Sequence, residues 1–534
     1  MSDYSCNLPS SWVVAPIGDL LSPLEDGRTL HHGWSPQCEK QPSSSEDEWG
    51  VLKTTAVQDG EFLPEHNKRL PTSLTPRQHL EVREGDLLIT CAGPRIRCGV
   101  PCLVRKTRRR LIISGKMYRF RVHDGLMDSR YIEAFLRSKH AQTEIDRMKT
   151  GISDSGLNLT HGRFLPLQVP VAPLNEQERI VAKIEELFSD LDAGVAALER
   201  AKANLKRYRA AVLKAAVEGK LTQKWRAENP PKEPASKLLA RILKERRKKW
   251  EQEQLAAYKA KGKQPPKNWR DKYKEPAGPG ANLPALPEGW CWACLSQLLA
   301  EPLRNGHSAK RSKDGTGVRT LTLTAITDGD FSEKNTKLTV ANPDKVADLW
   351  LKPGDIFIER SNTPELVGTA QLYRGPCKFA IFPDLLIRVR TTPLVSGVFV
   401  ETVLHSYPAR VYFRRRAQGI AGSMPKIDQT TVENLPLPLP PADEQETISV
   451  AVEEIMSAID SNETLIAAAT KRSPRLRQSI LKRAFEGRLV PQDPSDEPAT
   501  VLIERIAKGR AEATTKKNKR QKKQNRKKSK AAGR

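Results

Sequence analysis

The chain has 534 residues, of which 38% are hydrophobic, enough for about three or four domains with buried cores. Its formal net charge of +26 favours a polyanionic partner but does not choose among DNA, RNA and anionic lipid. No apolar run reaches the length of a membrane span, and residues 1–12 lack the basic and apolar segments of a secretion signal. Length and composition therefore predict a soluble, cytoplasmic protein that does not bind a membrane.

The eight cysteines are scattered rather than regularly spaced, which is typical of a reducing compartment. Cys98 and Cys102 form one close pair, and Cys291 and Cys294 form a CxxC, a spacing that zinc sites use. The CxxC lies inside WCWACL, which has the composition of a strand. The nine histidines show no metal-ligand spacing, so we expect no metal site.

Two short motifs near the N-terminus return in the second half of the chain. LPSSWVVAPIGDLL from Leu8 is repeated as LPEGWCWACLSQLL from Leu286, and EGDLLI around Asp86 is repeated as PGDIFI around Asp355. Each Gly-Asp pair predicts a turn that leads into an apolar strand. Between these fixed points the two copies differ in residue type and length, which is how two recognition scaffolds with different targets would differ.

The longest repeat is a predicted helix. The segment from Pro173 to Leu221 returns from Pro441 at a constant offset, 441 − 173 = 268. Apolar residues recur every seven positions in both copies, which predicts a left-handed supercoil with a partner helix. We expect Tyr208 to lie in this seam. The other predicted seam residues are Ile184, Leu187, Leu191, Leu198, Leu205, Val212, Val452, Ile455, Ile459, Ile466, Leu476 and Ile480.

The ends of the two predicted helices carry capping signals. Asn175 and Asp443 are the expected N-caps, each followed three residues later by Glu. Gly219 and Gly487 are the expected residues just beyond the last turn. Pro474 lies within the second helix, where we expect a kink.

The segments that follow each long helix are highly charged. Residues 222–285 predict a solvated linker with one short amphipathic helix, because EPASKLLARI from Glu233 returns as EPATVLIERI from Glu497. The last residues, 516–534, are strongly basic and contain no acid, which predicts a disordered tail that binds phosphate without sequence preference.

We find no catalytic signature in the sequence. There is no GxxxxGK[ST] or GxGxxG motif for nucleotide phosphates. Asn229-Pro230-Pro231 is followed by Lys232 rather than by the aromatic residue that stacks on a flipped base. What remains are polar and basic residues in divergent loops that could contact phosphates or base edges. The candidates for DNA binding are Arg95, Arg97, Arg105, Lys106, Arg108, Arg109, Arg110, Arg360, Asn362, Arg374, Arg414, Arg415 and Arg416.

The repeated motifs resemble the specificity subunits of type I restriction-modification systems. The LPxxW opening, the GDxxI turn and strand, the helix start PLxEQExI, repeated with Ala442 in place of Leu, and the LKxAxEGxL helix end occur in both copies in the order typical of that family. The resemblance implies an α+β protein with a pseudo-two-fold internal repeat, in which two mixed α/β target-recognition domains are joined by two long antiparallel coiled-coil helices. Each domain is expected to read one half of a bipartite, asymmetric site in double-stranded DNA.

The resemblance also implies a domain division and a set of partners. Two adenine methyltransferase subunits would carry S-adenosylmethionine, and restriction subunits would use ATP and Mg, with no cofactor and no catalytic residue in this chain. The expected segments are 1–163 (first recognition domain), 164–221 (first long helix), 222–285 (linker), 286–430 (second recognition domain), 431–489 (second long helix), 490–515 (short helical extension) and 516–534 (tail).

Two other hypotheses stay open from the residues alone. The chain could be a scaffold that binds nucleic acid without sequence preference, although aromatic residues make up only 6% of it, few for stacking on single strands. It could also be a nuclease or methyltransferase with an unrecognised site. Binding to random duplexes separates the first alternative, and modification of DNA by the chain alone would establish the second.

Overall fold

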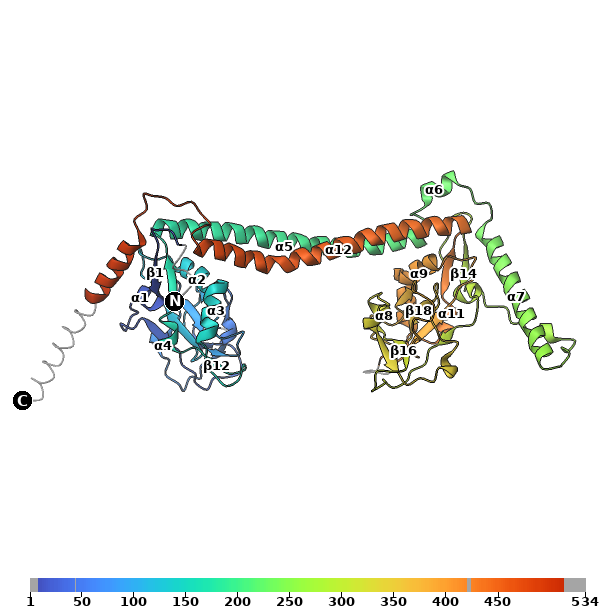
Figure 1. Ribbon diagram of the computed structural model, residues 1–534, viewed down its shortest axis with the longest axis horizontal. Helices are drawn as coiled ribbons and strands as arrows, with labels where there is room; N and C mark the ends of the chain where they lie inside the picture. Colours follow the sequence, from blue (N-terminus) through green and yellow to red (C-terminus); the bar gives the residue numbers. More distant parts are fainter. Residues whose placement is uncertain (1–7, 44, 420–423, 513–534) are drawn as a thin grey trace, which may run out of the picture. The chain divides into compact units, whose positions relative to one another are not determined.

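The structure is a computed structural model that describes residues 8–43, 45–419 and 424–512. Its contacts divide the chain into two units (Figure 1). The first unit comprises Met1–Leu198 with Ala468–Arg534, and the second unit comprises Glu199–Ala467. Each unit contains strands, short helices and part of both long helices, so each is described by itself.

The first unit is built around a four-stranded antiparallel sheet. Side chains alternate across it: Leu87 and Ile89 enter a core that includes Phe120, whereas Leu88 enters a second core with Met117. The sheet therefore separates two apolar cores. In spatial order its strands are β2 (Leu30–His32), β11 (Met117–Phe120), β7 (Leu87–Thr90) and β9 (Pro101–Leu103).

Shorter elements complete the first unit. The other strands are β1 (Val13–Pro16) with β13 (Gln168–Val171), β10 (Leu111–Ile112) with β3 (Gly50–Leu52) and β6 (Asn67–Arg69), β12 (Leu157–Asn158) with β8 (Ala92–Gly93), and β4 (Val57–Gln58) with β5 (Glu61–Phe62). The short helices are α1 (Ile17–Leu20), α2 (Ser129–Arg137), α3 (Lys139–Met148) and α4 (His161–Phe164), with 3-10 turns η2 (Thr54–Ala56) and η3 (Gln78–Leu80).

The second unit repeats this sheet and its two flanking cores, and we call the contacts that both units share the frame. Ile356 and Ile358 enter one core while Phe357 enters another, as in the first sheet. The strands of its sheet are β15 (Arg304–Asn305), β20 (Leu386–Val389), β18 (Ile356–Glu359) and β19 (Ala370–Leu372). The other elements are β14 (Cys291–Cys294) with β21 (Pro436–Leu439), β16 (Val318–Leu321) with β17 (Thr336–Thr339), α8 (Thr324–Thr327), α9 (Gly397–His405), α10 (Tyr407–Arg416), α11 (Gln429–Glu433), η5 (Leu295–Leu298), η6 (Glu333–Asn335) and η7 (Asp344–Val346).

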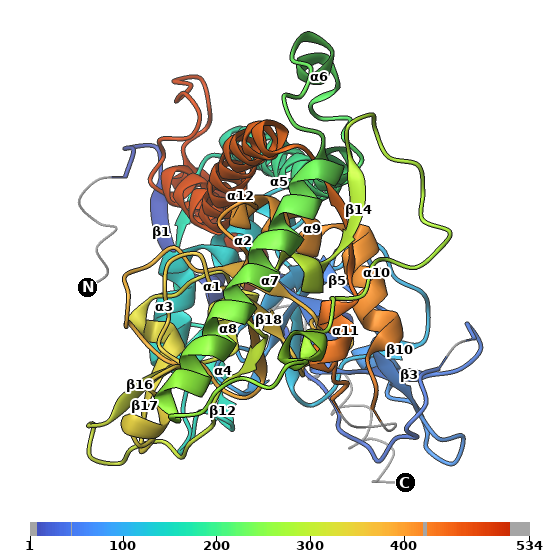
Figure 2. The same cartoon turned by 90° about the vertical axis from the view of Figure 1, so that its right-hand side faces the viewer.

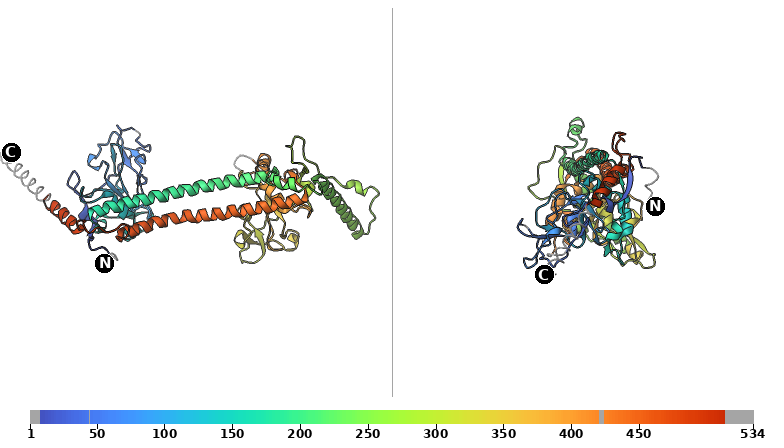
Figure 3. Two further views of the ribbon diagram at one scale, coloured as in Figure 1. Left: turned by 90° about the horizontal axis from the view of Figure 1, so that it is seen from above. Right: turned by 90° about the vertical axis from the view of Figure 1, so that its left-hand side faces the viewer.

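The two long helices are α5 (Leu174–Val217) and α12 (Ala442–Phe485), each of 44 residues. Within each unit their segments lie side by side (Figure 3). In the first unit Ile184 of α5 shares a core with Phe485 of α12, and in the second unit Ala216 shares one with Ile448. The α12 helix continues through Pro474 without a break.

The helix starts differ from the predicted capping. Gln177 N–H donates to the carbonyl of Pro173 at 2.9 Å, and Gln445 N–H donates to that of Pro441 at 3.0 Å. The first helical hydrogen bond thus forms ahead of Asn175 and Asp443, so neither residue is the N-cap. Proline suits this place because its fixed φ fits the entry to a helix and its missing N–H would have no partner there.

The predicted helix ends are confirmed. Gly219 and Gly487 have φ of 66° and 68°, the left-handed conformation that glycine adopts without cost. Lys220 N–H donates to the carbonyl of Ala215 at 2.8 Å, closing a Schellman turn. Both copies therefore end in the same way.

Two predicted seam residues lie outside the helix contact. Tyr208 is 52% exposed and Leu476 is 50% exposed. They are equivalent, since 208 + 268 = 476. A straight helix drifts about 20° per heptad against a strict seven-residue repeat, which amounts to about 70° over the residues from Val452 to Leu476. The position one residue later takes the contact instead, as Arg477 does over the ring of Phe188, 4.6 Å from its centroid.

The charged segment after α5 is more ordered than a solvated linker. It contains α6 (Gln223–Glu228) and η4 (Trp269–Lys272), and the predicted short helix is 26 residues long, α7 (Ala235–Ala260), in the foreground of Figure 2. The KERRKKWEQEQ stretch consists largely of strong helix formers, so it extends the helix. Trp250 stacks on Trp269 with ring centroids 5.8 Å apart, which holds the returning chain against α7.

The last described residues form the equivalent helix in the first unit, at 499–512. Ala499 N–H donates to the carbonyl of Ser11 at 2.9 Å, as Ala235 N–H does to that of Gly289 at 2.8 Å. The predicted basic tail at 516–534 lies outside the described residues. Across the ranges that the structure describes, no helix is both long and apolar enough to cross a membrane.

Candidate nucleic-acid interface

The predicted Gly-Asp turn of the first unit anchors a buried ion-pair network. Gly85 has φ of 84°, and the Asp86 carboxylate behind it is fully buried. Asp86 accepts from Arg121 Nε at 2.5 Å and from Arg119 Nη1 at 3.2 Å. Burial raises the pKa of Asp86, against the lowering effect of Arg119 and Arg121. These ion pairs lie inside the domain and hold the Gly85-Asp86 turn in place.

The second unit repeats the network. Gly354 has φ of 89°, and Asp355 accepts from Arg390 Nη2 at 3.0 Å. Arg388 pairs with Glu301 at 3.0 Å. Arg121 and Arg390 thus pair with the Gly-Asp carboxylate in both copies, and Arg119 and Arg388 are buried on the same strand, so these repeated arginines belong to the shared interior.

Two predicted DNA-binding residues also belong to the frame. Arg105 pairs with buried Glu133 at 2.6 Å, and Arg374 pairs with buried Glu401 at 3.0 Å. Each glutamate also accepts a backbone N–H of the preceding strand, from Leu103 or Leu372, at 2.7 Å. Arg105 and Arg374 therefore compensate buried carboxylates.

Four more candidates in the first unit hold loops together. Arg95 pairs with Asp146 at 2.7 Å and with Asp154 at 2.9 Å. The other three donate to loop carbonyls: Arg97 to Val57 O at 2.7 Å, Arg108 to Ser45 O and Glu48 O at 3.2 Å, and Arg110 to Asp47 O. Lys106 and Arg109 are exposed, and within the described residues their side chains form no hydrogen bond or ion pair.

In the second unit, too, some predicted DNA-binding residues have partners within the unit and others have none. Asn362 donates to Glu359 at 2.8 Å, Arg414 donates to Glu365 O at 3.4 Å, and Arg416 lies 3.9 Å from the ring centroid of Tyr412. The side chains of Arg360 and Arg415 have no hydrogen-bond or ion-pair partner in the described part of the chain. The exposed cations Lys106, Arg109 and Arg415, together with the half-buried Arg360, are thus the candidates that are free to meet a ligand.

A hollow of about 700 Å³ lies in the first unit, beside the ends of β7, β11 and β12. The ring centroid of Tyr118 lies 4.4 Å from that of His161 and 5.5 Å from that of His32, and the two histidine rings lie 6.0 Å apart. The Tyr118 hydroxyl donates to the carbonyl of Leu159 at 2.7 Å, which fixes the central ring. The α4 and β12 elements that border the hollow lie away from α5 (Figure 1).

These histidines were not among the predicted site residues, because the histidines of the sequence show no metal-ligand spacing and His161 carries no motif. A usable signal was the turn that follows: Gly33 and Gly306 both lie so close to backbone carbonyls that a Cβ would come within 2.2 and 2.1 Å of one. This shared turn aligns the two copies where their side chains differ.

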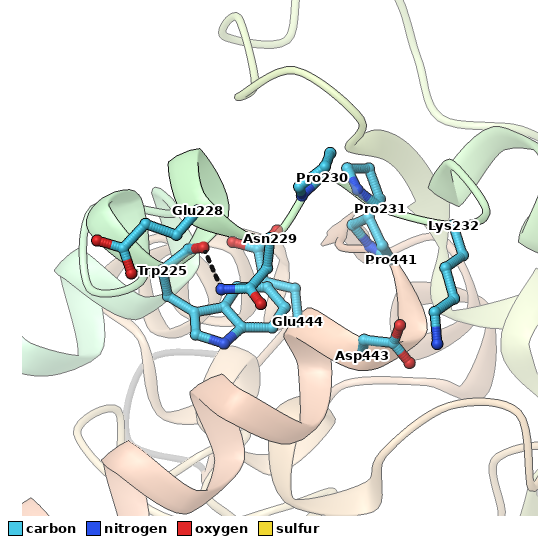
Figure 4. A pocket seen from close by; sticks show the side chains of 9 residues that line it. All are labelled: Trp225, Glu228, Asn229, Pro230, Pro231, Lys232, Pro441, Asp443 and Glu444. Atoms are coloured by element: carbon cyan, nitrogen blue, oxygen red, sulfur yellow. Dashed lines mark hydrogen bonds between the residues drawn. The ribbon is translucent and has the colours of Figure 1, made fainter.

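A second pocket lies at the start of α12 in the second unit (Figure 4). Trp225 and Asn229 form one side, and Lys232 and Asp443 form the other. Beneath it the buried Glu444 carboxylate accepts from Trp290 Nε1 at 2.8 Å and from Thr222 Oγ1 at 2.6 Å. The pocket therefore lies over a frame contact.

The first unit carries the same contact. Glu176 accepts from Trp12 Nε1 at 3.0 Å and from Gln492 Nε2 at 2.6 Å. Burial raises the pKa of Glu176. Each glutamate thus joins the opening tryptophan of its domain to the start of a long helix. Among the described residues, no three potential ligands are grouped to hold a metal ion.

The fold and these sites define a class of protein, built from two copies of a mixed helix-and-strand scaffold that share a frame and differ in their exposed side chains. No protein-family model matches the chain. It is 24% identical over 530 residues to the Type I restriction enzyme EcoKI specificity subunit of Escherichia coli K12, covering 96% of this chain and 99% of the relative. The StySPI specificity subunit of Salmonella potsdam is also 24% identical, with the same coverage.

Higher identity is confined to part of the chain. The EcoEI specificity subunit of Escherichia coli is 37% identical over 185 residues, which span 35% of this chain and 30% of that relative. Two solved structures share the fold at 18% identity. The HsdS subunit from Thermoanaerobacter tengcongensis has a TM-score of 0.54 over 92% of this chain and all of the other.

The second solved structure, from a study of assembly and conformational transition of the type I restriction-modification system, has a TM-score of 0.59 over 90% of this chain and 99% of the other. The resemblance drawn from the repeated motifs is confirmed. The chain is thus similar over nearly its full length to specificity subunits of type I restriction-modification systems.

Proposed function

We propose that the chain is the DNA-recognition and assembly subunit of a type I restriction-modification complex. Residues 1–163 and 286–430 each read one half of a bipartite, asymmetric site in duplex DNA. The long-helix segments, 164–221 and 431–489, pack antiparallel and set the spacing between the two halves. The segments 222–285, 490–515 and 516–534 extend this frame.

The observation that carries the proposal is the duplicated frame with divergent exposed residues. Trp12 and Glu176 form the same buried hydrogen bond as Trp290 and Glu444. Around these shared contacts the exposed residues differ, as expected for two domains that read different sequences.

The proposal assigns the chemistry to partners. Two adenine methyltransferase subunits would bring S-adenosylmethionine, and restriction subunits would bring ATP and Mg, all in the cytoplasm. This chain would hold no cofactor and perform no catalysis of its own. Its role is to choose the site and to position the enzymes there.

Methylome sequencing of host cells with and without the gene tests the proposal. We expect one bipartite, asymmetric adenine-methylation motif that is lost when the gene is deleted. A methylome that the deletion leaves unchanged, in cells that retain active modification subunits, contradicts the proposal. Binding without any consensus would indicate the scaffold hypothesis instead.

A domain exchange tests whether the two halves are read independently. Residues 12–164 are replaced by the matching segment of a specificity subunit with a known target. Because each domain has its own cores, only one half of the methylated motif should change. A change in both halves would refute independent reading.

A further inference from the structure

The hollow of the first unit has a counterpart at the same place in the second unit. Strand pairing aligns them: His32 lies opposite Tyr118 in one sheet, as Asn305 lies opposite Ile387 in the other. Leu159 N–H donates to the carbonyl of Cys91 at 2.8 Å, and Ile427 N–H donates to that of Arg360 at 2.9 Å.

The next turn completes the alignment. His161 is the first residue of α4 and Gln429 is the first residue of α11. Three equivalent pairs follow from these contacts: His32 with Asn305, Cys91 with Arg360, and His161 with Gln429. We call the first members, together with Tyr118, the first end cluster, and the second members the second end cluster.

The end clusters differ where the frame around them is the same. Arg119 and Arg121 recur as Arg388 and Arg390, whereas Tyr118, which pairs with His32, is replaced by Ile387. Alternate residues of a strand point to opposite faces. The face with the buried arginines is thus retained, while on the other face the residue beside each end cluster differs between the copies.

The chemistry of the end clusters suits base edges better than phosphates. Burial, assisted by His32, lowers the pKa of His161, so its imidazole is neutral at neutral pH and can both donate and accept. Phosphates are mostly held by cations, whereas base edges present mixed donors and acceptors. Tyr118 holds the imidazole of His161 in place at the mouth of the hollow.

The second end cluster combines side chains that read purines. Gln429 Nε2 donates to Asn305 Oδ1 at 3.1 Å, which orients both amides. Arg360 is half-buried and has no hydrogen-bond or ion-pair partner among the described residues. Asn and Gln pair with the edge of adenine, and Arg pairs with that of guanine.

We propose that the two end clusters are the base-reading contacts of this chain: His32 and His161 for one half-site, and Asn305, Arg360 and Gln429 for the other. This inference rests on the proposed function and deepens it. It also separates reading from binding, since the exposed cations Lys106, Arg109 and Arg415 lie outside both clusters and would contact phosphates.

The test measures the methylated motif of cells that express the chain with its own modification subunits. Replacing His32→Ala with His161→Ala should relax one or two positions of one half-site, with a loss of about tenfold or more in preference at each. The other half-site and the spacer should stay unchanged. Asn305→Ala with Gln429→Ala should have the same effect on the opposite half-site. Arg109→Ala, a matched control outside the clusters, should change no position.

A conservative double substitution controls for variants that fail to fold. His32→Asn with His161→Gln retains neutral polar side chains and should select different bases at those same positions. If the wild-type chain gives a bipartite motif and every cluster variant that melts at the wild-type temperature gives the same motif, the inference is overturned while the proposed function stands. If the wild-type chain gives no bipartite motif, the proposed function itself fails.

Discussion

At the residue scale, each of the two buried glutamates uses both carboxylate oxygens as acceptors. Glu176 accepts from Trp12 and Gln492, and Glu444 accepts from Trp290 and Thr222. An amide would place an N–H group against a donor at position 176, and at position 444 it would place one toward Arg226, whose Nη1 lies 3.6 Å from the carboxylate. We therefore expect Glu176→Gln and Glu444→Gln each to destabilise its own unit by about 1–3 kcal/mol.

Hydrogen exchange of the full chain measures this effect unit by unit. Faster exchange should be confined to the first unit for Glu176→Gln and to the second for Glu444→Gln. The pH dependence has a definite sign, because burial raises the pKa of Glu176. Its contribution to stability is full below the ordinary carboxyl pKa and is lost as pH rises through the raised value, so Glu176→Gln should remove this pH dependence from the first unit.

The arginines separate into frame and ligand-facing groups. Arg105→Ala leaves the Glu133 carboxylate buried without its cation, and we expect a loss of about 1–2 kcal/mol, discounted because Arg105 is half exposed. The methylated motif should stay the same.

Arg109→Ala should leave the free energy of unfolding unchanged and weaken duplex binding. The slope of log affinity against log salt concentration should fall by about one. Titrations at several salt concentrations with the assembled complex, alongside chemical unfolding, distinguish the two variants. A new motif from Arg105→Ala would contradict its place in the frame.

At the element scale, the seven-residue pattern predicts the two long helices but not every contact along them. The pattern does not show the slow rotation of the helix face that leaves Tyr208 and Leu476 exposed.

The first unit offers a matched pair of leucines on α12. Leu481 is 2% exposed, so Leu481→Ala should cost about 2–5 kcal/mol, whereas Leu476→Ala should cost about 0.5 kcal/mol or less. Equal costs from hydrogen exchange of the first unit would show that Leu476 packs in the seam.

The frame was predictable from sequence where both copies retain one residue type. Gly85-Asp86 and Gly354-Asp355 stand out because identical pairs recur at one offset. The end clusters were not predictable, since His32 and Asn305 share no chemistry and the loops between fixed points differ in length. The structure aligns them through strand pairing and through the shared turns at Gly33 and Gly306. The roles of Arg105 and Arg374 were hidden for another reason: their partners, Glu133 and Glu401, lie about 28 residues away on a helix.

At the scale of the whole molecule, the long helices are predicted to act as a ruler between the two domains. Arg477 of α12 pairs with Asp192 of α5 in the first unit, and Arg209 of α5 pairs with Asp460 of α12 in the second. The pairs share one register, since 192 + 477 = 209 + 460 = 669. Four residues inserted after Leu198 and four after Ala467 leave both pairs intact, because the insertions fall at the boundary between the units.

This paired insertion adds about 6 Å of helix and about one turn, so the seam nearly retains its facing. The spacer in the methylated motif should lengthen by about one or two base pairs, with both half-sites unchanged. Inserting four residues after Leu198 alone is the matched control. It shifts α5 by one turn against α12, so one of the two ion pairs must break, and we expect a less stable chain. A motif whose spacer keeps its length after the paired insertion would show that something other than α5 and α12 sets the distance between the half-sites.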